Sequence, residues 1–156
     1  MKVLFLDIDG VLNSHSYFKS VDPHLLAHSI PERLCKENIT HLNTIVRAVP
    51  CVIVISSSWR HIHDRHEMAL FLGVRGFGGA MILGQTPIHR SLRTRGAEIQ
   101  AALDNMPEPV TGFVILDDDN DGMDDFKDNF VRTDSNVGLT SEDAEKAIRI
   151  LRRETR

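Results

Sequence analysis

Residues 1–14 read MKVLFLDIDGVLNS, an apolar run that ends in two aspartates one residue apart. The run Val3–Leu6 has no polar alternation, which is typical of a strand buried on both faces of a parallel sheet. Asp7 and Asp9 follow it, and Gly10 stands behind them, where glycine permits a sharp turn. Buried carboxylates cost free energy unless a partner compensates them. The stretch therefore predicts a functional site at the end of the first strand.

Two more apolar runs, Val52–Ile55 and Phe113–Leu116, repeat this pattern later in the chain. Helical patterns separate and follow the runs, at residues 31–49, 59–72, 95–104 and after the capping residue Thr140. Residues 129–133 fit a short edge strand, whereas residues 73–92 contain five glycines and at most one strand. Strands that alternate with helices predict an α/β fold with a parallel sheet, whose ligands bind at the carboxyl ends of the strands.

Composition and charge narrow the class of protein. The 156 residues are 42% hydrophobic and 26% charged, which predicts a single globular domain over residues 1–156. The net charge of -4 argues against a molecule that is basic all over, although residues 89–95 are locally rich in cations. Cys35 and Cys51 lack the spacing of a zinc site and suit a reducing compartment. Since no apolar segment approaches the roughly 20 residues of a membrane span, we expect a cytoplasmic protein with no membrane partner.

Polar residues follow each of the three predicted strands. The residues are carboxylates in Asp7–Gly10, hydroxyls in Ser56–Arg60 and carboxylates again in Asp117–Asp121. Because the carboxyl ends of parallel strands share one edge of the sheet, we expect these groups to converge. Several anions in one place need a cation, and hard oxygen ligands suit Mg²⁺, which also binds phosphate oxygens. The sequence therefore predicts a Mg²⁺ site that acts on a phosphorylated substrate.

The motifs at these strand ends resemble those of the haloacid dehalogenase (HAD) superfamily of phosphatases. DIDGVLN matches the first motif, the serine that ends VIVIS the second, a basic residue at a helix start the third, and ILDD the fourth. The order SSSWR, RGAEI, VILDDD, GLT is also similar to the HAD domains of bacterial and phage RNA-repair and polynucleotide kinase-phosphatase proteins. The resemblance implies a Rossmann-like three-layer α/β/α sandwich, essentially without a cap domain, and a phosphomonoesterase that depends on Mg²⁺.

The resemblance assigns the chemistry to the acidic residues. Asp7 is expected to attack phosphorus and form an aspartyl-phosphate, and Asp9 to act first as the general acid and then as the general base. Their spacing puts both carboxylates on the same side of the strand end. Mg²⁺ is expected on Asp7, on the main-chain carbonyl of Asp9 and on Asp118, with Asp117 supporting the metal site.

Ser56 and a basic residue are expected to bind the transferred phosphoryl group. The Ser56 hydroxyl would donate to a phosphoryl oxygen, as would the first amides of the helix that follows. Ser57 or Ser58 is expected to cap that helix, and Ser57 is also a candidate contact for the substrate. Arg95 is the favoured basic residue because it opens the helix GAEIQAAL, and Arg90 and Arg93 remain alternatives, in a family that mostly uses lysine here.

Trp59 and Arg60 follow the second motif directly. Trp59 either packs against the core or stacks on a base, and Arg60 is a candidate contact for a phosphate. Neither 14–50 nor 61–94 is long enough for a full cap, so the site is expected to admit a phosphate on a large molecule. A polynucleotide 3′-phosphatase agrees with this; a small-molecule or nucleotide phosphatase and a catalytically silent binding module are the alternatives. Because no P-loop with its lysine occurs, a repair-protein partner would lie on another chain.

The acidic run also fits the start of an EF-hand calcium loop, from Asp117 through Gly122 to Asp128 at the twelfth position. However, the strand-like run FVIL precedes it where an EF-hand needs a helix. The twelfth residue is aspartate, which reaches less far than glutamate. Since the calcium-binding interpretation also gives no role to Asp7 and Asp9, the HAD interpretation is preferred.

Overall fold

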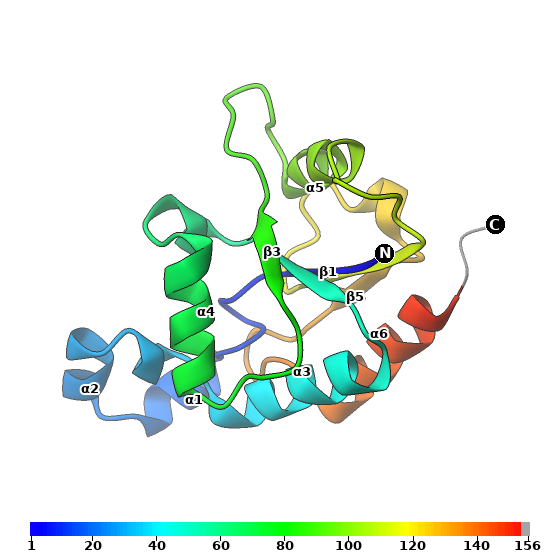
Figure 1. The fold of residues 1–156 in the computed structure, drawn as a ribbon. Helices are drawn as coiled ribbons and strands as arrows, with labels where there is room; N and C mark the ends of the chain where they lie inside the picture. Colours follow the sequence, from blue (N-terminus) through cyan, green and yellow to red (C-terminus); the bar gives the residue numbers. More distant parts are fainter. Residues whose placement is uncertain (154–156) are drawn as a thin grey trace.

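The computed structural model describes residues 1–153. Its centre is a sheet of five parallel strands in the order β3-β2-β1-β4-β5, so the first strand of the chain lies in the middle (Figure 1). The strands are β1 (Lys2–Leu6), β2 (Val52–Ile55), β3 (Ile82–Gln85), β4 (Gly112–Asp117) and β5 (Phe130–Arg132). The expected α/β fold with a parallel sheet is confirmed.

Helices pack on both faces of this sheet and make three layers (Figure 1). The α-helices are α1 (His15–Ser20), α2 (Pro23–His28), α3 (Lys36–Ala48), α4 (Arg65–Val74), α5 (Arg95–Asp104) and α6 (Ser141–Arg152). The 3₁₀ helices are η1 (Pro31–Arg33), η2 (Ser58–His61) and η3 (Asp124–Phe126). One face of the sheet carries α3, α4 and α6, and the other carries α5 and η3. Within the described residues, no helix combines the length and the apolar character needed to cross a membrane.

The side chains of β1 alternate between two hydrophobic cores. Leu4 and Leu6 belong to the core under α3, α4 and α6. Val3 and Phe5 belong to the core under α5, where they share a cluster with Ile99. All four strand residues are fully buried, and each such side chain contributes about 1.5–3 kcal/mol relative to exposure. The strand is therefore covered on both faces, as its unbroken apolar run predicts.

The register of the sheet brings three strand ends to one edge. Leu6 is aligned with Ile55 of β2 and with Leu116 of β4. The N–H of Asp7 donates to the Leu116 carbonyl at 3.0 Å, and the N–H of Ser56 donates to the Leu6 carbonyl at 2.8 Å. The residues that follow these strands therefore lie side by side.

Several sequence-based predictions are confirmed element by element. The three apolar runs are β1, β2 and β4, residues 129–133 contain the edge strand β5, and residues 95–104 form α5. Thr140 caps α6: its hydroxyl accepts from the N–H of Asp143 at 3.2 Å, and the Asp143 carboxylate accepts from the N–H of Thr140 at 3.1 Å. The glycine-rich segment 73–92 contributes the single short strand β3.

Two expected helices begin later than predicted. The expected helix at residues 31–49 is broken, because the chain is extended at Cys35 and its N–H donates to the Leu12 carbonyl at 2.7 Å. Only α3 continues from there. The expected helix at residues 59–72 starts as the 3₁₀ helix η2, and α4 begins after Asp64, whose side chain caps it.

The two short helices α1 and α2 are not anticipated by the hydrophobic pattern, since neither contains a buried residue. Local side chains hold them instead. The Ser14 hydroxyl accepts from the N–H of Tyr17, and the Asp22 carboxylate accepts from the N–H of His24, with Pro23 at the first helical position. In the described residues, the segment from α1 to η1 carries no strand, so it is no cap domain with a sheet of its own.

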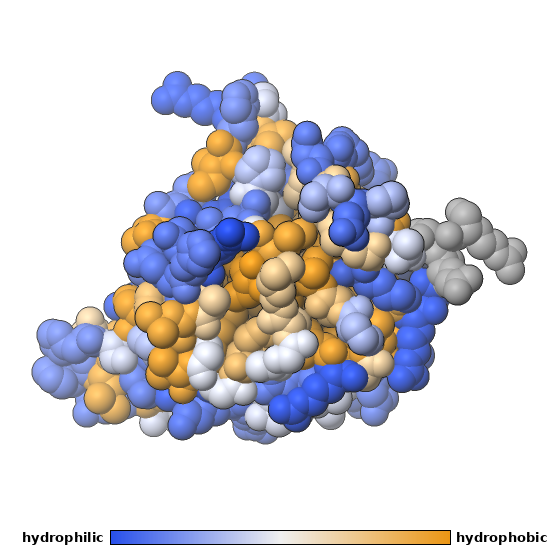
Figure 2. Space-filling model, in the orientation of Figure 1, coloured by the Kyte–Doolittle hydropathy of each residue, from blue (hydrophilic) through white to orange (hydrophobic). Residues whose placement is uncertain are grey.

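Apolar side chains reach the surface around α4 and β3 (Figure 2). Leu70 and Val74 of α4 and Met81, which precedes β3, are each more than half exposed. Because β3 lies at one end of the strand order, this is the apolar edge of the sheet. The carboxyl ends of the central strands are polar by contrast.

Candidate active site

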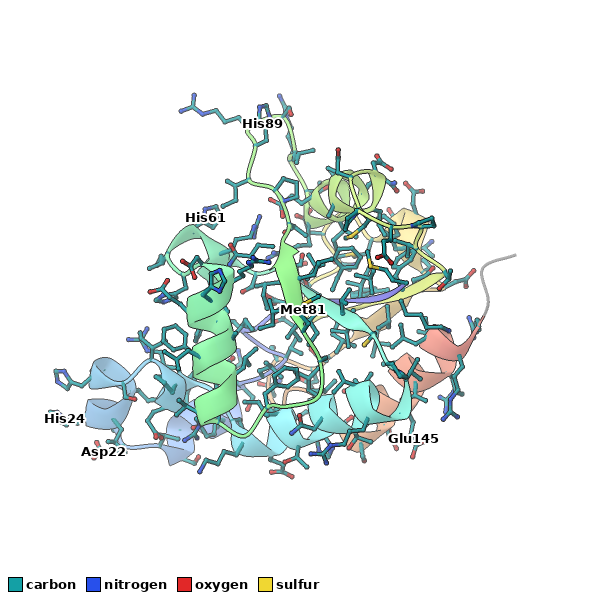
Figure 3. The ribbon with its side chains drawn as sticks, viewed as in Figure 1. Asp22, His24, His61, Met81, His89 and Glu145 are labelled. Carbon is teal, nitrogen blue, oxygen red and sulfur yellow. The ribbon has the colours of Figure 1, made fainter. Side chains whose placement is uncertain are left out.

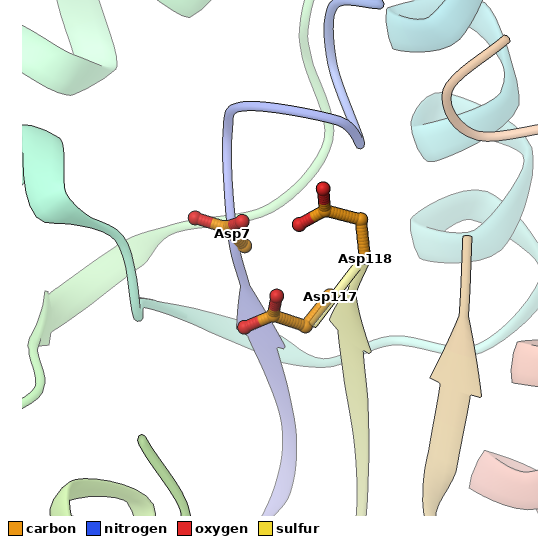
Figure 4. A group of neighbouring side chains, drawn as sticks. All are labelled: Asp7, Asp117 and Asp118. Carbon is orange, nitrogen blue, oxygen red and sulfur yellow. The ribbon is translucent and has the colours of Figure 1, made fainter. Parts of the chain in front are cut away.

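Three carboxylates converge at the carboxyl edge of the sheet. Asp7 extends from the end of β1, and Asp117 and Asp118 extend from the end of β4 (Figure 4). Ligand oxygens of the three residues lie within 4.8 Å of one another. Asp7 and Asp117 are buried, and Asp118 is partly exposed. Carboxylates this close repel one another unless a cation or a proton intervenes.

Burial raises the pKa of two carboxyls in this cluster. Burial raises the pKa of Asp7 to about 6, although the nearby Arg95 guanidinium opposes the shift. Burial and then the charge of Asp7 raise the pKa of Asp117 to about 8. All the donors here are carboxylate oxygens, which suit a hard divalent cation. The cluster can therefore bind a metal ion, and a cation there would compensate the charge.

Arg95 is the basic residue that the fold brings to the cluster. Its Nε lies 3.5 Å from Oδ2 of Asp117. Its Nη1 is buried and has no hydrogen-bond partner among the described residues. Arg90 and Arg93 are exposed in a loop that projects beyond the sheet, with His89 near its tip (Figure 3). Of the three arginines considered from the sequence, Arg95 alone contacts a cluster residue.

Gly10 fits a turn that no other residue would make without strain. Its φ of +78° is in the left-handed region, and a Cβ at this position would lie 2.4 Å from Oδ2 of Asp118. Its N–H donates to Oδ1 of Asn13 at 2.9 Å, and its carbonyl accepts from the Thr133 hydroxyl at 2.7 Å. The turn therefore lets the first-motif loop approach the Asp118 carboxylate closely.

Two serines at the end of β2 have different environments. Ser56 is 1% exposed, and its hydroxyl has no hydrogen-bond partner among the described residues. Buried hydroxyls are rarely left unpaired in native proteins. The Ser57 hydroxyl accepts from the N–H of Trp59 at 3.3 Å, which caps η2, and its hydrogen bond to Asp7 lowers the pKa of that carboxyl. Ser57 thus both caps and contacts the cluster.

Asp9 stands apart from the cluster and is held by two donors. Nδ2 of Asn13 donates to one carboxylate oxygen at 2.9 Å, and the indole Nε1 of Trp59 donates to the other at 3.0 Å. The Asp9 side chain is exposed, whereas Asp7 is 6% exposed. Trp59 also packs against the hydrophobic core, which is one of its two alternatives from the sequence, and its indole N–H points toward Asp9. The two first-motif aspartates therefore occupy different environments.

Arg60 pairs with a carboxylate of α5 and so joins η2 to that helix. Its Nη2 lies 2.6 Å from Oε1 of Glu98, and its Nη1 donates to the Ser57 carbonyl at 2.7 Å. The residue is 8% exposed. The structure therefore places Arg60 in a buried ion pair and not at an open surface.

The loop after β4 packs on the first turn of α5. Asp121 accepts from the N–H of Arg95 through its carboxylate at 3.0 Å and from the N–H of Gly96 through its carbonyl at 3.1 Å. A Cβ on Gly96 would lie 1.9 Å from the Gly122 carbonyl oxygen, so glycine is required at this contact. The acidic run follows the strand β4, not a helix, which removes the flanking element that the EF-hand alternative needs.

The parallel sheet, with acidic, hydroxyl and basic groups at its carboxyl edge, has the architecture of a HAD-type phosphatase. Residues 3–144 match the family described as the HAD domain in Swiss Army Knife RNA repair proteins, and the chain belongs to that family. Membership makes it a phosphatase of the HAD type and confirms the resemblance found in the motifs. No curated protein and no solved structure gives a match.

Four polar residues of the site have no assignment from the sequence: Asn13, Arg33, Glu98 and Thr133. Asn13 lies inside the first motif, DIDGVLN, where its i, i+4 relation to Asp9 was available as a signal. Arg33, Glu98 and Thr133 reach the site from distant segments, so only the fold brings them there.

Proposed function

We propose that the protein is a Mg²⁺-dependent phosphomonoesterase that works through an aspartyl-phosphate on Asp7 and removes 3′-phosphates from polynucleotide ends. The observation that carries this proposal is the meeting of the three-carboxylate cluster with the unpaired, buried hydroxyl of Ser56 at one sheet edge. Buried carboxylates and an unpaired hydroxyl both cost free energy. A cation together with a phosphate would offset both costs.

The acidic cluster fits a magnesium ion in its chemistry. Asp7 and Asp118 would hold the ion together with the main-chain carbonyl of Asp9, and Asp117 would support the site beside Arg95. Bound Mg²⁺ would neutralise charge between the anionic nucleophile and the phosphate and polarise the phosphoryl oxygen. The close approach of Gly10 to Asp118 would keep the first-motif loop near these ligands.

In the first step, a carboxylate oxygen of Asp7 attacks phosphorus and forms a P–O bond. The bond between phosphorus and the leaving oxygen breaks, and its electron pair stays on that oxygen. Protonated Asp9 donates its proton to the leaving oxygen. The hydrogen bonds from Asn13 and Trp59 fix the Asp9 carboxyl for this transfer.

In the second step, ionised Asp9 takes a proton from a water molecule as the water oxygen attacks phosphorus. The P–O bond to Asp7 breaks, the Asp7 carboxylate is restored and inorganic phosphate leaves. Asp9 is then protonated again and ready for another substrate. The exposure of Asp9 suits this role, because both the leaving group and the water must reach it.

Ser56 and Arg95 would hold the oxygens of the transferred phosphoryl group. Each offers a buried donor that has no hydrogen-bond partner within the described residues: the hydroxyl of Ser56, and Nη1 of Arg95, whose one ion-pair contact there is Glu98 at 4.0 Å. Ser57 would assist through its contact with Asp7. Arg60 would act on the substrate indirectly, by pairing with Glu98 on the helix that carries Arg95.

Membership in a family of RNA-repair domains supports a polynucleotide as the substrate. An open site without a cap would admit the end of a long molecule, and Trp59 would lie beside its terminal nucleoside. We further infer that residues 1–153 form one domain, because both cores lie on faces of one sheet; the last three residues of the predicted domain 1–156 lie outside the described residues. The free cysteines Cys35 and Cys51 are consistent with a reducing, cytoplasmic location. A repair partner on another chain would supply the steps that this domain lacks.

Phosphate release from matched substrates tests this function. The substrates are one oligonucleotide with a 3′-phosphate, the same oligonucleotide with a 5′-phosphate, and an aryl phosphate, each with Mg²⁺ and with excess EDTA. We expect EDTA to abolish hydrolysis of all three substrates. With Mg²⁺, we expect the oligonucleotide with a 3′-phosphate to be hydrolysed faster than the one with a 5′-phosphate. Faster hydrolysis of small phosphoesters than of both oligonucleotides would point to the small-molecule phosphatase instead.

A further inference from the structure

A cavity of about 220 Å³ borders the Asp9 carboxylate and none of the clustered carboxylates. It is lined by Asp9, Arg33, Ser58, Trp59, Ile62 and His63. We propose that this cavity binds the terminal nucleoside of a polynucleotide 3′-phosphate, and that Arg33 binds the next phosphate along the chain. The inference rests on the proposed function and adds a binding site for the leaving group.

The position of Asp9 identifies this cavity as the leaving-group side of the site. A general acid must come within hydrogen-bond distance of the oxygen that it protonates. The carbon skeleton attached to that oxygen must therefore lie next to Asp9. Because Asn13 and Trp59 hold the carboxylate at 2.9 Å and 3.0 Å, the direction of this approach is fixed.

The walls of the cavity suit a nucleoside. The rings of Trp59 and His63 lie with centroids 6.0 Å apart, and His63 is fixed in turn by an edge contact of 5.0 Å with Phe71. Ile62 is 79% exposed, which leaves its apolar side chain free to contact a base at the rim of the cavity. Aromatic and apolar surfaces of this kind hold bases by stacking, with little dependence on sequence.

Arg33 contributes a cation whose charge has no acidic partner within residues 1–153. Its Nε donates to the Leu26 carbonyl at 2.8 Å, and its own carbonyl accepts from Asn13 at 3.2 Å, so the residue is anchored on both sides. The neighbouring Glu32 pairs with Arg75 at 3.1 Å and not with Arg33. No ion pair of Arg33 occurs within residues 1–153. The Nη groups of a guanidinium in this state are well suited to bind a phosphate.

This arrangement predicts selection for chain length. A nucleoside 3′-phosphate would fill the cavity but leave Arg33 without a partner, whereas a dinucleotide would offer it the internucleotide phosphate. This arrangement also gives the segment that contains α1, α2 and η1 a role in binding substrate. The segment supplies Arg33 to the lining of the cavity, and η2 supplies Ser58 and Trp59. A short insertion would thus provide the substrate contact that other enzymes take from a cap.

The test compares a nucleoside 3′-phosphate with a 5′-hydroxyl dinucleotide 3′-phosphate that has the same terminal base. We expect the wild-type protein to prefer the dinucleotide by roughly tenfold in kcat/KM, as loss of one charged hydrogen-bonding contact implies. For the dinucleotide, log(kcat/KM) should also fall more steeply with log[salt], with a slope larger by about 0.7 for one neutralised phosphate. Arg33→Gln should bring the ratio of the two kcat/KM values close to one and remove the difference between the two salt slopes. Arg33→Lys should keep the slope and part of the preference.

Arg47→Gln, which removes an exposed arginine of α3, is the matched control and should keep the wild-type preference. An unchanged preference in Arg33→Gln, or equal salt slopes for the two substrates in the wild-type protein, overturns the inference while the phosphatase function stands. Should Arg33→Gln not fold, the wild-type slopes alone decide. Failure of the wild-type protein to hydrolyse either substrate overturns the proposed function and this inference together.

Discussion

Trp59 and Asp9 are joined by a hydrogen bond of 3.0 Å from the indole Nε1 to a carboxylate oxygen. The bond connects Trp59, which follows the second motif, with Asp9, the second aspartate of the first motif. Because Trp59 packs, partly buried, against the core, the donor is held in place by the packing of an aromatic ring. Trp59 is therefore a positioning residue for Asp9.

Trp59→Phe keeps the ring and removes this donor. We expect kcat to fall by about tenfold for alkyl phosphates, a fraction of the effect of losing a general acid. An activated aryl phosphate should be much less affected, because its leaving oxygen needs little protonation. The two substrates are compared at saturating Mg²⁺. Equal losses on both would show that the bond does not serve proton transfer.

Asp117 makes the metal-free protein sensitive to pH. Its pKa rises from 3.8 to about 8 on folding, so its favourable contribution is complete below 3.8 and is lost as the pH rises through about 8. Asp117→Asn should therefore raise the Tm of the metal-free protein at alkaline pH. Near pH 3.8 the substitution should leave the Tm nearly unchanged. Thermal melts in EDTA across this range measure the difference. A constant difference at all pH values would contradict the assignment.

Gly10→Ala tests the close approach between the first-motif turn and the metal cluster. The new Cβ would lie 2.4 Å from Oδ2 of Asp118, at a φ of +78° that alanine rarely adopts. We expect a weaker affinity for Mg²⁺, measured as the concentration that gives half-maximal activity, and a loss of stability of about 1–3 kcal/mol. Gly73→Ala serves as the control, since no atom of the described residues outside its own helix lies within 4 Å of its added Cβ. Wild-type behaviour of Gly10→Ala would refute the steric argument.

The buried ion pair between Arg60 and Glu98 is expected to matter for stability. Arg60→Leu leaves the Glu98 carboxylate, 16% exposed, with Arg95 at 4.0 Å as its remaining cation. We expect a loss of about 3 kcal/mol in the free energy of unfolding, at the lower end of the range for a broken buried pair. The double variant with Glu98→Leu should recover part of this loss. Denaturant unfolding of Arg60→Leu, Glu98→Leu and the double variant measures the three losses of stability. If the two single losses add up to the loss of the double variant, there is no direct pair.

The convergence of Asp7, Ser56 and Asp118 could be predicted because it follows from local rules. Unbroken apolar runs identify buried parallel strands, and all such strands end at one edge. The structure confirms that Asp7 and Asp118 meet, and it adds Asp117 to their cluster, where the sequence indicated only support. Side-chain direction at the last residue of β4 is set by the pleat and the register, which a motif alone does not specify.

The remainder of the site depends on contacts between distant segments. Arg33 reaches the cavity because α1 and α2 fold beside it, and these helices contain no buried residue that would produce a hydrophobic period. Arg60 looks like a substrate contact from its place after the second motif. Its pairing with Glu98 depends on how α5 crosses the sheet, which the sequence does not show.

The nucleophile is the central claim, and trapping the covalent intermediate tests it most directly. Asp9→Asn is expected to slow hydrolysis of the aspartyl-phosphate, so the intermediate should accumulate when this variant is mixed with an aryl phosphate and Mg²⁺. Borohydride reduces an acyl phosphate to an alcohol, and mass spectrometry of the digested protein locates the change. We expect homoserine in place of Asp7, only with substrate and Mg²⁺ present, and none in the matched Asp7→Asn, Asp9→Asn double variant. Homoserine at another position, or an unmodified Asp7 in a sample that releases phosphate, would contradict the account.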